Sequence, residues 1–312
     1  MKINPKARID RGRVRVRRGG GRSGGFPMPG GGGSGGGSGL PIPTGGGIVG
    51  IVLVVILLIV LAQCNGGLPG MGSSSSDTSG DEIADCETGA DAAKSENCKL
   101  NLFVSAIERF WDEELPKEAG VDYTDAQMQI FSGSTSSGCG QASSAMGPFY
   151  CPADKYVYID STFFDDMLQK DLGAQGGDFA EAYVVAHEYG HHVQDLLGTM
   201  AKAQSRETGP TSPSVRLELQ ADCYAGVWAH YATTVEDENG EVFITDITQD
   251  DINRAIDAAT AVGDDRIQQR TQGHVNEEQW THGSAEERVR WFTRGYQEGT
   301  IDSCDTFSAS SL

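Results

Sequence analysis

Apolar residues recur at helical spacing in several stretches of the chain and at strand spacing in one. Residues three and four apart share one face of a helix. The spacing therefore predicts helices at residues 101–114, 163–172, 179–197, 213–233, 250–262 and 285–298. Residues 155–160 (KYVYID) are rich in strand formers and predict a strand. Asp178 is suited to cap the helix at 179–197, and Gly198 to end it. Many helices with one or two strands predict an α+β domain, mostly helical with a small sheet.

One stretch is apolar throughout. Residues 47–62 read GIVGIVLVVILLIVLA and carry no charge. With Gly45 and Gly46 the run reaches about 18 residues, close to the shortest helix that crosses a bilayer. We therefore predict one transmembrane helix at 47–63, through which the protein contacts membrane lipid.

Charge differs on the two sides of this run. Residues 1–46 contain nine Lys and Arg and one acidic residue, while the rest of the chain contains 15 basic and 43 acidic residues. Positive flanks stay in the cytoplasm. This predicts a single-pass protein of the cell membrane, with a basic, glycine-rich cytoplasmic tail at 1–46, a flexible acidic linker at 64–85 and an extracytoplasmic domain at 86–312. The acidic body would repel phosphate, so no nucleic-acid partner is expected.

The seventh cysteine, Cys64, lies at the membrane edge, whereas the other six lie in the predicted domain at 86–312, as in a disulfide framework formed in an oxidising compartment. They are Cys86, Cys98, Cys139, Cys151, Cys223 and Cys304. Six cysteines allow fifteen pairings, and sequence alone does not choose among them. Short loops favour Cys86–Cys98 and Cys139–Cys151, which would leave Cys223 for Cys304.

The predicted helix at 179–197 contains His187, Glu188 and His191 in an H-E-x-x-H pattern. Histidines four apart lie on one helical face, so both imidazoles can reach one metal ion. Glu188 is rotated by about 100° from His187. It can therefore reach a water on the ion and act as a general base. The alternative is a solvated helix with two ordinary histidines.

The next predicted helix supplies two acids. Glu218 can be the third protein ligand that a zinc site with an open fourth position needs. Asp222 lies one turn further on the same face and can accept a hydrogen bond from the other nitrogen of a ligand histidine. A third histidine ligand is excluded, because Gln194 and Leu197 stand where glycine and histidine would be required.

Other residues keep two interpretations open. His282, just before the last predicted helix, is a candidate catalytic residue that stabilises an oxyanion, or else a simple cap-region residue. Arg288 can pair with Asp222. Tyr156 and Tyr158, on the predicted strand, either belong to a strand that aligns a peptide or are core aromatics. His192 points away from the metal face, which indicates a structural or a solvated role.

Three segments carry a family resemblance: GPFYCPADKYVYID, AYVVAHEYGHHVQDLLG and RLELQADCYAGVWAH. They closely resemble the bacterial neutral zinc metallopeptidases that have a single N-terminal membrane span, and the resemblance covers most of residues 98–312. It implies a zincin-like fold and Zn2+ held by His187, His191 and Glu218. It also implies that Glu188 is the general base.

The function expected from the motif and the resemblance is a membrane-anchored zinc peptidase that acts on a peptide or protein substrate. The alternative is a catalytically silent extracytoplasmic binding or scaffold domain with a structural metal. The intact Glu188 favours the enzyme, since a structural site needs no base.

Overall fold

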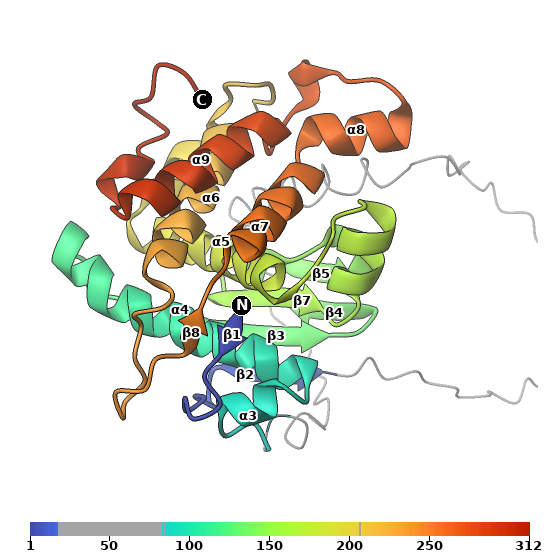
Figure 1. The fold of residues 1–312 in the computed structure, drawn as a ribbon. Coiled ribbons are helices and arrows are strands. Elements are labelled where there is room, and N and C mark those ends of the chain that lie inside the picture. Colours follow the sequence, from blue (N-terminus) through green and yellow to red (C-terminus); the bar gives the residue numbers. More distant parts are fainter. Residues whose placement is uncertain (18–82, 84, 206) are drawn as a thin grey trace, which may run out of the picture.

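The computed structural model describes residues 1–17, 83, 85–205 and 207–312. Helices make up most of this part of the chain, and a small mixed sheet lies against them (Figure 1). The mixture of helices and strands agrees with the predicted α+β class. The main helices are α4 (Glu96–Ala119), α5 (Asp178–Leu196), α6 (Pro213–Tyr231), α7 (Gln249–Ala261), α8 (Asp264–Gln272) and α9 (Ala285–Glu298). Shorter helical segments are α3 (Gly89–Ala92) and Phe163–Asp171.

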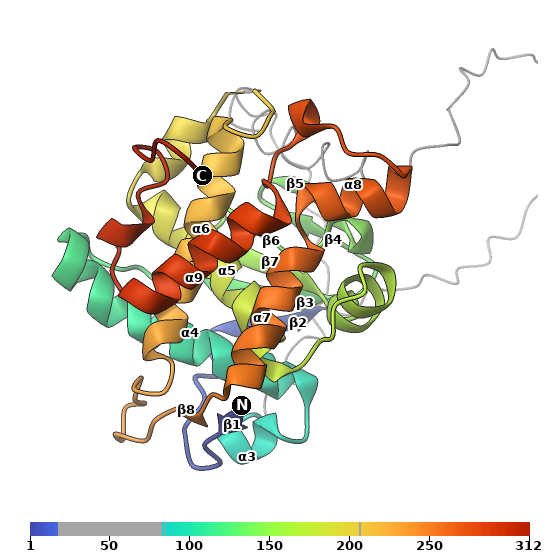
Figure 2. The same ribbon diagram turned by 45° about the horizontal axis from the view of Figure 1, so that its top comes forward.

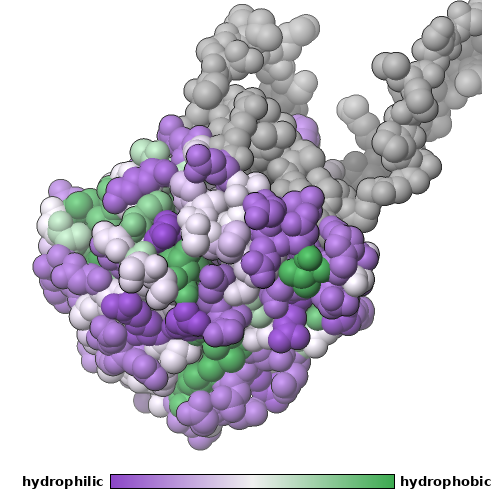
Figure 3. Space-filling view, turned by 90° about the horizontal axis from the view of Figure 1, so that it is seen from above, coloured by the Kyte–Doolittle hydropathy of each residue, from purple (hydrophilic) through white to green (hydrophobic). Residues whose placement is uncertain are grey.

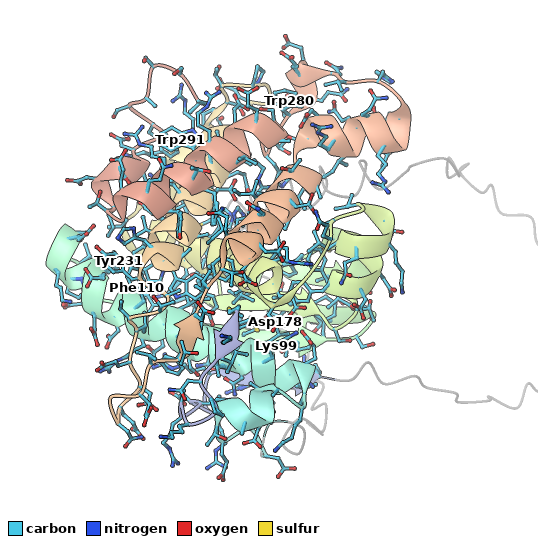
Figure 4. All side chains as sticks on the ribbon, viewed as in Figure 1. Lys99, Phe110, Asp178, Tyr231, Trp280 and Trp291 are labelled. Carbon is cyan, nitrogen blue, oxygen red and sulfur yellow. A yellow bond between two sulfur atoms is a disulfide. The ribbon has the colours of Figure 1, made fainter. Side chains whose placement is uncertain are left out.

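Helix α5 runs through the centre of the molecule and packs against α4, α6 and α7. Every residue from Phe179 to Gln194 is buried, so the polar side chains of this helix need partners inside the protein. Asp178 is the first helical residue and not the cap, because Gly177, with a φ of 117°, occupies the N-cap position. Lys99 of α4 binds Asp178 at 3.1 Å and ties the two helices together (Figure 4).

The main sheet has four strands in the order β2-β3-β7-β6. They are β2 (Val14–Arg17), β3 (Gln127–Phe131), β7 (Tyr156–Asp160) and β6 (Phe149–Cys151). β2 and β7 each pair in parallel with β3, while β6 runs antiparallel to β7. β6 is therefore an edge of the sheet and β7 is an inner strand. Two smaller pairs are β1 (Lys2–Ile3) with β8 (Ile244–Asp246), and β4 (Ser134–Ser137) with β5 (Gly140–Ser143).

Residues 1–17 are part of this domain, which differs from the separate tail that the sequence predicts. β2 forms one edge of the main sheet; Val14 and Val16 are buried, while Arg15 between them is exposed. Such alternation of valine and arginine is a strand pattern with one apolar face. The sequence did not predict this strand, because its arginines also fit the positive charge expected on the cytoplasmic side of a membrane span.

Helix α6 is held in place from more than one side. Gly226 of α6 and Gly295 of α9 lie where these two helices touch, and a Cβ on Gly295 would lie 2.0 Å from the carbonyl oxygen of Cys223. Phe110 of α4 stacks on Tyr231 at the end of α6, with ring centroids 5.5 Å apart (Figure 4). Close packing of this kind fixes the helix that carries the predicted acidic ligand.

Three disulfides join the six cysteines from Cys86 onward: Cys86–Cys98, Cys139–Cys151 and Cys223–Cys304. They are the pairs that short loops favour in the sequence. Cys223–Cys304 connects α6 to the C-terminal segment, and Cys139–Cys151 connects the edge strand β6 to the loop that follows β4. Two of the cross-links therefore brace elements that contact α5, namely α6 and β6.

The predicted membrane span at 47–63 lies outside the described residues. Among the residues that are described, no helix is both long and apolar enough to cross a membrane. The face seen in Figure 3 is largely hydrophilic, with small apolar areas between polar ones. In the described part of the chain, Val275 is the one large apolar side chain that is exposed, at 43%.

Candidate metal centre

Three side chains from α5 and α6 converge on one point. His187 and His191 lie one turn apart on α5, and Glu218 faces them from α6, with one potential ligand atom of each within 4.8 Å of the others. The Nε2 atom of His187 is 3.3 Å from one Glu218 oxygen, and Nε2 of His191 is 3.6 Å from the other. Tetrahedral zinc with bonds of about 2.0–2.1 Å holds its ligand atoms roughly 3.4 Å apart. The donor atoms therefore fit this ion.

Asp222 orients His187. It lies one turn beyond Glu218 on α6 and is fully buried. One of its oxygens is 2.9 Å from Nδ1 of His187 and also accepts a hydrogen bond from the Tyr183 hydroxyl at 2.6 Å. Arg288 of α9 donates to both oxygens, at 2.8 and 2.9 Å. The pairing of Arg288 with Asp222, one of the possibilities in the sequence, is confirmed.

These contacts set the charge of Asp222 and the orientation of the His187 ring. Burial opposes ionisation, but the charges of Arg288 and His187 lower the pKa of the Asp222 carboxyl to about 2. The ionised carboxylate holds the Nδ1 side of His187, and Nε2 on the other side of the ring faces Glu218. Tyr183 was missed in the sequence; its place one turn before His187 is the signal that could have found it.

His191 is oriented by Gln194, whose only use in the sequence was to exclude a third histidine ligand. The side-chain oxygen of Gln194 lies 2.8 Å from Nδ1 of His191. Its amide nitrogen donates to the carbonyl oxygen of Leu217 at 2.7 Å and to the side-chain oxygen of Gln220 at 3.1 Å. Those bonds keep the amide oxygen turned toward the imidazole. The spacing of three residues on one helical face was the available signal.

Glu188 lines the same cavity as the three ligand residues and is buried. Burial raises the pKa of its carboxyl, and the nearby His187 and His191 oppose that rise. A carboxyl with a pKa closer to neutrality is better matched to proton transfer near pH 7. Its position and environment therefore suit the general base that the motif predicts.

His282 reaches this cavity from the loop before α9. Asp264, at the start of α8, accepts hydrogen bonds from the backbone N–H groups of Thr281, His282 and Gly283 at 2.7, 2.7 and 3.1 Å. The other Asp264 oxygen lies 3.4 Å from Nδ1 of His282. Burial opposes protonation, but the carboxylates of Glu218 and Asp264 raise the pKa of His282. One acid therefore holds both the loop and the imidazole.

A cavity of about 290 Å³ opens beside the ligand set. Its polar wall contains His187, Glu188, His191, Glu218, His282 and Arg288. The remaining walls are mostly apolar and include Phe149, Phe163, Met167, Leu172, Met200 and Ile267. The edge strand β6 forms part of the wall and lies beside α5 (Figure 2). The site therefore combines three residues that can bind a metal with a mostly apolar cavity, which we call the trough.

The prediction that the strand at 155–160 aligns a peptide is wrong. β7 pairs with β3 along its whole length and with β6 from Tyr156 to Tyr158, so neither edge is free at the two tyrosines. Tyr156 and Tyr158 pack instead in a small apolar cluster, where the ring of Tyr158 stacks on Phe149 with centroids 4.9 Å apart. The interpretation as core aromatics is confirmed for Tyr158, which is buried, while Tyr156 packs against the cluster and is only partly buried.

His192 follows the candidate ligand His191 directly but contributes to the packing of α5. It is fully buried, and its Nδ1 lies 3.0 Å from the Tyr150 hydroxyl. Its Nε2 lies 2.6 Å from the carbonyl oxygen of Thr124. The structural role that the helical geometry predicts for His192 is confirmed.

Gly190, inside the H-E-x-x-H motif, lies where α5 meets α6. A Cβ at this position would lie 3.0 Å from the carbonyl oxygen of Ala221 and 3.1 Å from its Cα. Ala221 directly precedes Asp222, on the helix that carries Glu218. The absence of a side chain at Gly190 thus lets the acidic helix approach the histidine helix closely.

Known proteins share most of this sequence. Residues 14–307 match the family described as "Putative neutral zinc metallopeptidase". The uncharacterized protein Rv2575 of Mycobacterium tuberculosis is 51% identical over 234 residues, which cover 75% of this chain and 78% of that protein. The uncharacterized protein YpfJ of Escherichia coli K12 is 43% identical over 215 residues, covering 67% and 71%. No solved structure matches. Because the family match spans α5, α6 and most of the chain, the protein belongs to this family.

Proposed function

We infer that this protein is a zinc-dependent peptidase that hydrolyses peptide bonds. The observation that carries the proposal is the donor set, in which His187, His191 and Glu218 fit tetrahedral zinc. Each histidine also has its other nitrogen held by a buried acceptor, Asp222 or Gln194. Three protein ligands and one open position are typical of catalytic zinc. The description of the family supports the same chemistry.

Zinc bound by these residues would supply Lewis acidity to a peptide carbonyl and would acidify a water molecule. Glu188, beside the ligands, accepts the proton of the attacking water and passes it to the leaving amine. His282, held by Asp264, stabilises the negative charge that develops on the carbonyl oxygen. Asp222 and Gln194 keep the two imidazoles in place during the attack.

The substrate in this proposal is an extended peptide that lies along β6. An edge strand offers unpaired backbone N–H and C=O groups, and a peptide can add to it as a further strand. β6 contributes Phe149 and Tyr150 to the cavity wall, so a peptide on this edge passes the donor set. The apolar walls favour a large apolar side chain next to the bond that is cleaved.

Peptides that differ at one residue next to the scissile bond are expected to show this preference. Burial of a leucine or phenylalanine side chain contributes about 1.5–3 kcal/mol, so kcat/KM should exceed that of the glycine peptide by roughly 10–100-fold. Met167→Asp should reduce the preference, since Met167 lines the cavity. Gln169→Asp, the same change two residues away and outside the cavity wall, should leave it intact. Equal rates for all peptides would contradict the assignment of the trough.

A binding or scaffold domain with a structural metal is the alternative. A structural zinc site is usually closed by four protein ligands. In the part of the chain that the structure describes, the group that could hold a metal comprises three residues: His187, His191 and Glu218. A structural site also has no need of Glu188 beside it. Both features favour the hydrolase.

The zinc content of the purified full-length chain tests the ligand assignment. About one zinc per chain is expected in the wild type, and His187→Ala should lose most of it on dialysis, because only two ligands remain. His230→Ala is the matched control: His230 binds the carbonyl oxygen of Tyr296 on α9 and is remote from the ligand set. Zinc-dependent peptide hydrolysis should follow the same order. Equal zinc in all three proteins would rule out the proposed site.

We also propose attachment to a membrane through residues 47–62. The support is the sequence, which has no charged residue in this apolar run. The three disulfides of the peptidase domain favour a position outside the cytoplasm, where such bonds persist. The proposed partners are thus membrane lipid and a peptide or protein substrate on the outer side.

A further inference from the structure

The N-terminal segment, residues 1–17, pairs with the body of the domain (residues 85–312) through its backbone. β2 keeps a continuous parallel register with β3, beginning with Val14 opposite Met128. β1 pairs with β8, and Arg8 forms a bridge with Thr88. The family match begins at residue 14, the first residue of β2. The strand is therefore part of the sequence pattern that the family shares.

Apolar side chains of the N-terminal segment belong to the main hydrophobic core. Ala7, Ile9, Val14 and Val16 are all buried there. The side chain of Asn4 is buried as well and donates to the carbonyl oxygen of Val242 at 2.8 Å. A segment that contributes side chains to the shared core folds with the body and is not a separate tail.

Basic residues of the N-terminal segment pair with acids of the body. Arg13 binds Glu108, whose side chain is fully buried, and also binds Asp125 at 2.7 Å. Lys2 binds Asp246 at 3.4 Å. The positive charge of this segment therefore has a structural use in the fold. The positive charge of residues 1–17 therefore does not by itself indicate a cytoplasmic location.

We propose that the N-terminal segment and the body lie on the same side of the membrane. Strands pair at about 5 Å, whereas the hydrocarbon core is about 30 Å thick, so the two parts cannot meet across it. Residues 17 and 83, which flank the undescribed stretch containing the apolar run, then lie on one side. The single crossing that the charge pattern predicts would instead separate β2 from β3. The Cys86–Cys98 disulfide, close to Thr88, places this side outside the cytoplasm.

Cysteine labelling of the full-length chain tests the sidedness. Ser23→Cys and Ser75→Cys, one before and one after the apolar run, are each placed in a Cys64→Ser background and expressed in a Gram-negative bacterium. A maleimide that does not cross membranes is added to spheroplasts, and lysed cells give the full extent of labelling. Both cysteines are expected to react equally before lysis. Protection of Ser23→Cys alone until lysis would overturn the proposal.

Cross-linking tests the docking itself in isolated membranes. A zero-length carbodiimide joins an amine to a carboxylate only when the two touch, so it should link Lys2 to Asp246, both of which are solvent-accessible. Mass spectrometry of the digested protein identifies the linked peptides. Lys2→Arg is the control, because it keeps the charge and removes the reactive amine. Failure to find the link in the wild type would overturn the docking, and hydrolysis assays on the same membranes report separately on the peptidase.

Discussion

Glu188→Gln is expected to keep its zinc and its fold and to lose about 10²–10⁴-fold in kcat, the usual effect of removing a general base. The amide keeps the size of the carboxyl but cannot accept a proton from water. Glu188 is not among the three residues that can hold the metal, so the substitution separates chemistry from metal binding. Zinc content and the turnover of one peptide are measured on the same preparation.

Two further variants sharpen this result. Glu218→Gln should weaken zinc retention itself, because a neutral ligand no longer balances the charge of the ion. Asp222→Asn should reduce zinc affinity or activity by about 10–100-fold, as changes to partners of ligand histidines commonly do. Full peptidase activity in Glu188→Gln would sink the hydrolytic mechanism, whatever the zinc content of the three proteins.

Arg13→Met is expected to lower the free energy of unfolding by about 2–3 kcal/mol. Loss of one partner from a fully buried ion pair costs about 3–5 kcal/mol. Glu108 is fully buried, but the side chain of Arg13 is 21% exposed, so the cost should fall toward or below the lower end of that range. Urea unfolding of the full-length protein measures the effect.

Arg8→Met is the matched control, since it removes another arginine of the N-terminal segment. The side chain of Arg8 lies 3.9 Å from Glu238, and both side chains are exposed. Exposed pairs contribute about 0–1 kcal/mol, so this variant should unfold close to the wild type. Equal losses in the two variants would show that Arg13 has no special role in docking the segment.

The helices were the part of the fold that the sequence could predict. A periodic apolar face is a local signal, and four predicted helices overlap α5, α6, α7 and α9 with ends within about two residues. Helix α8 was missed because Asp264–Gln272 is strongly polar and has little apolar periodicity to detect. The Asp178 assignment failed by one position, because Gly177 supplies a backbone conformation that composition does not reveal.

The sheet was harder to predict, because its strands are short and pair over long distances in the chain. β2 lies more than a hundred residues before β3, and no local pattern announces that contact. The strand at β7 was recognised from its composition, yet its place inside the sheet could not be known without β3 and β6. Edge and inner strands differ in their neighbours and not in their own residues.

The candidate site also contains residues that local spacing predicts and residues that only the tertiary structure reveals. His187, Glu188 and His191 follow from spacing along one helix, and Glu218 with Asp222 from spacing along another. That the two helices face each other came from tertiary packing. Gln194 and Tyr183 are ordinary buried residues by type; only the position of the imidazole nitrogens reveals what they hold.

Gly190 gives the metal centre a property that its ligand list does not contain. A residue with a Cβ would need α6 to move away from α5 by a few tenths of an ångström, and Glu218 would move with it. In the proposed site, a larger residue at position 190 would therefore weaken zinc binding by moving the ligand on α6 away from the two on α5. The H-E-x-x-H pattern allows any residue at position 190. In this chain a small residue is needed there, because it lets α6 come close enough for Glu218 to share an ion with His191.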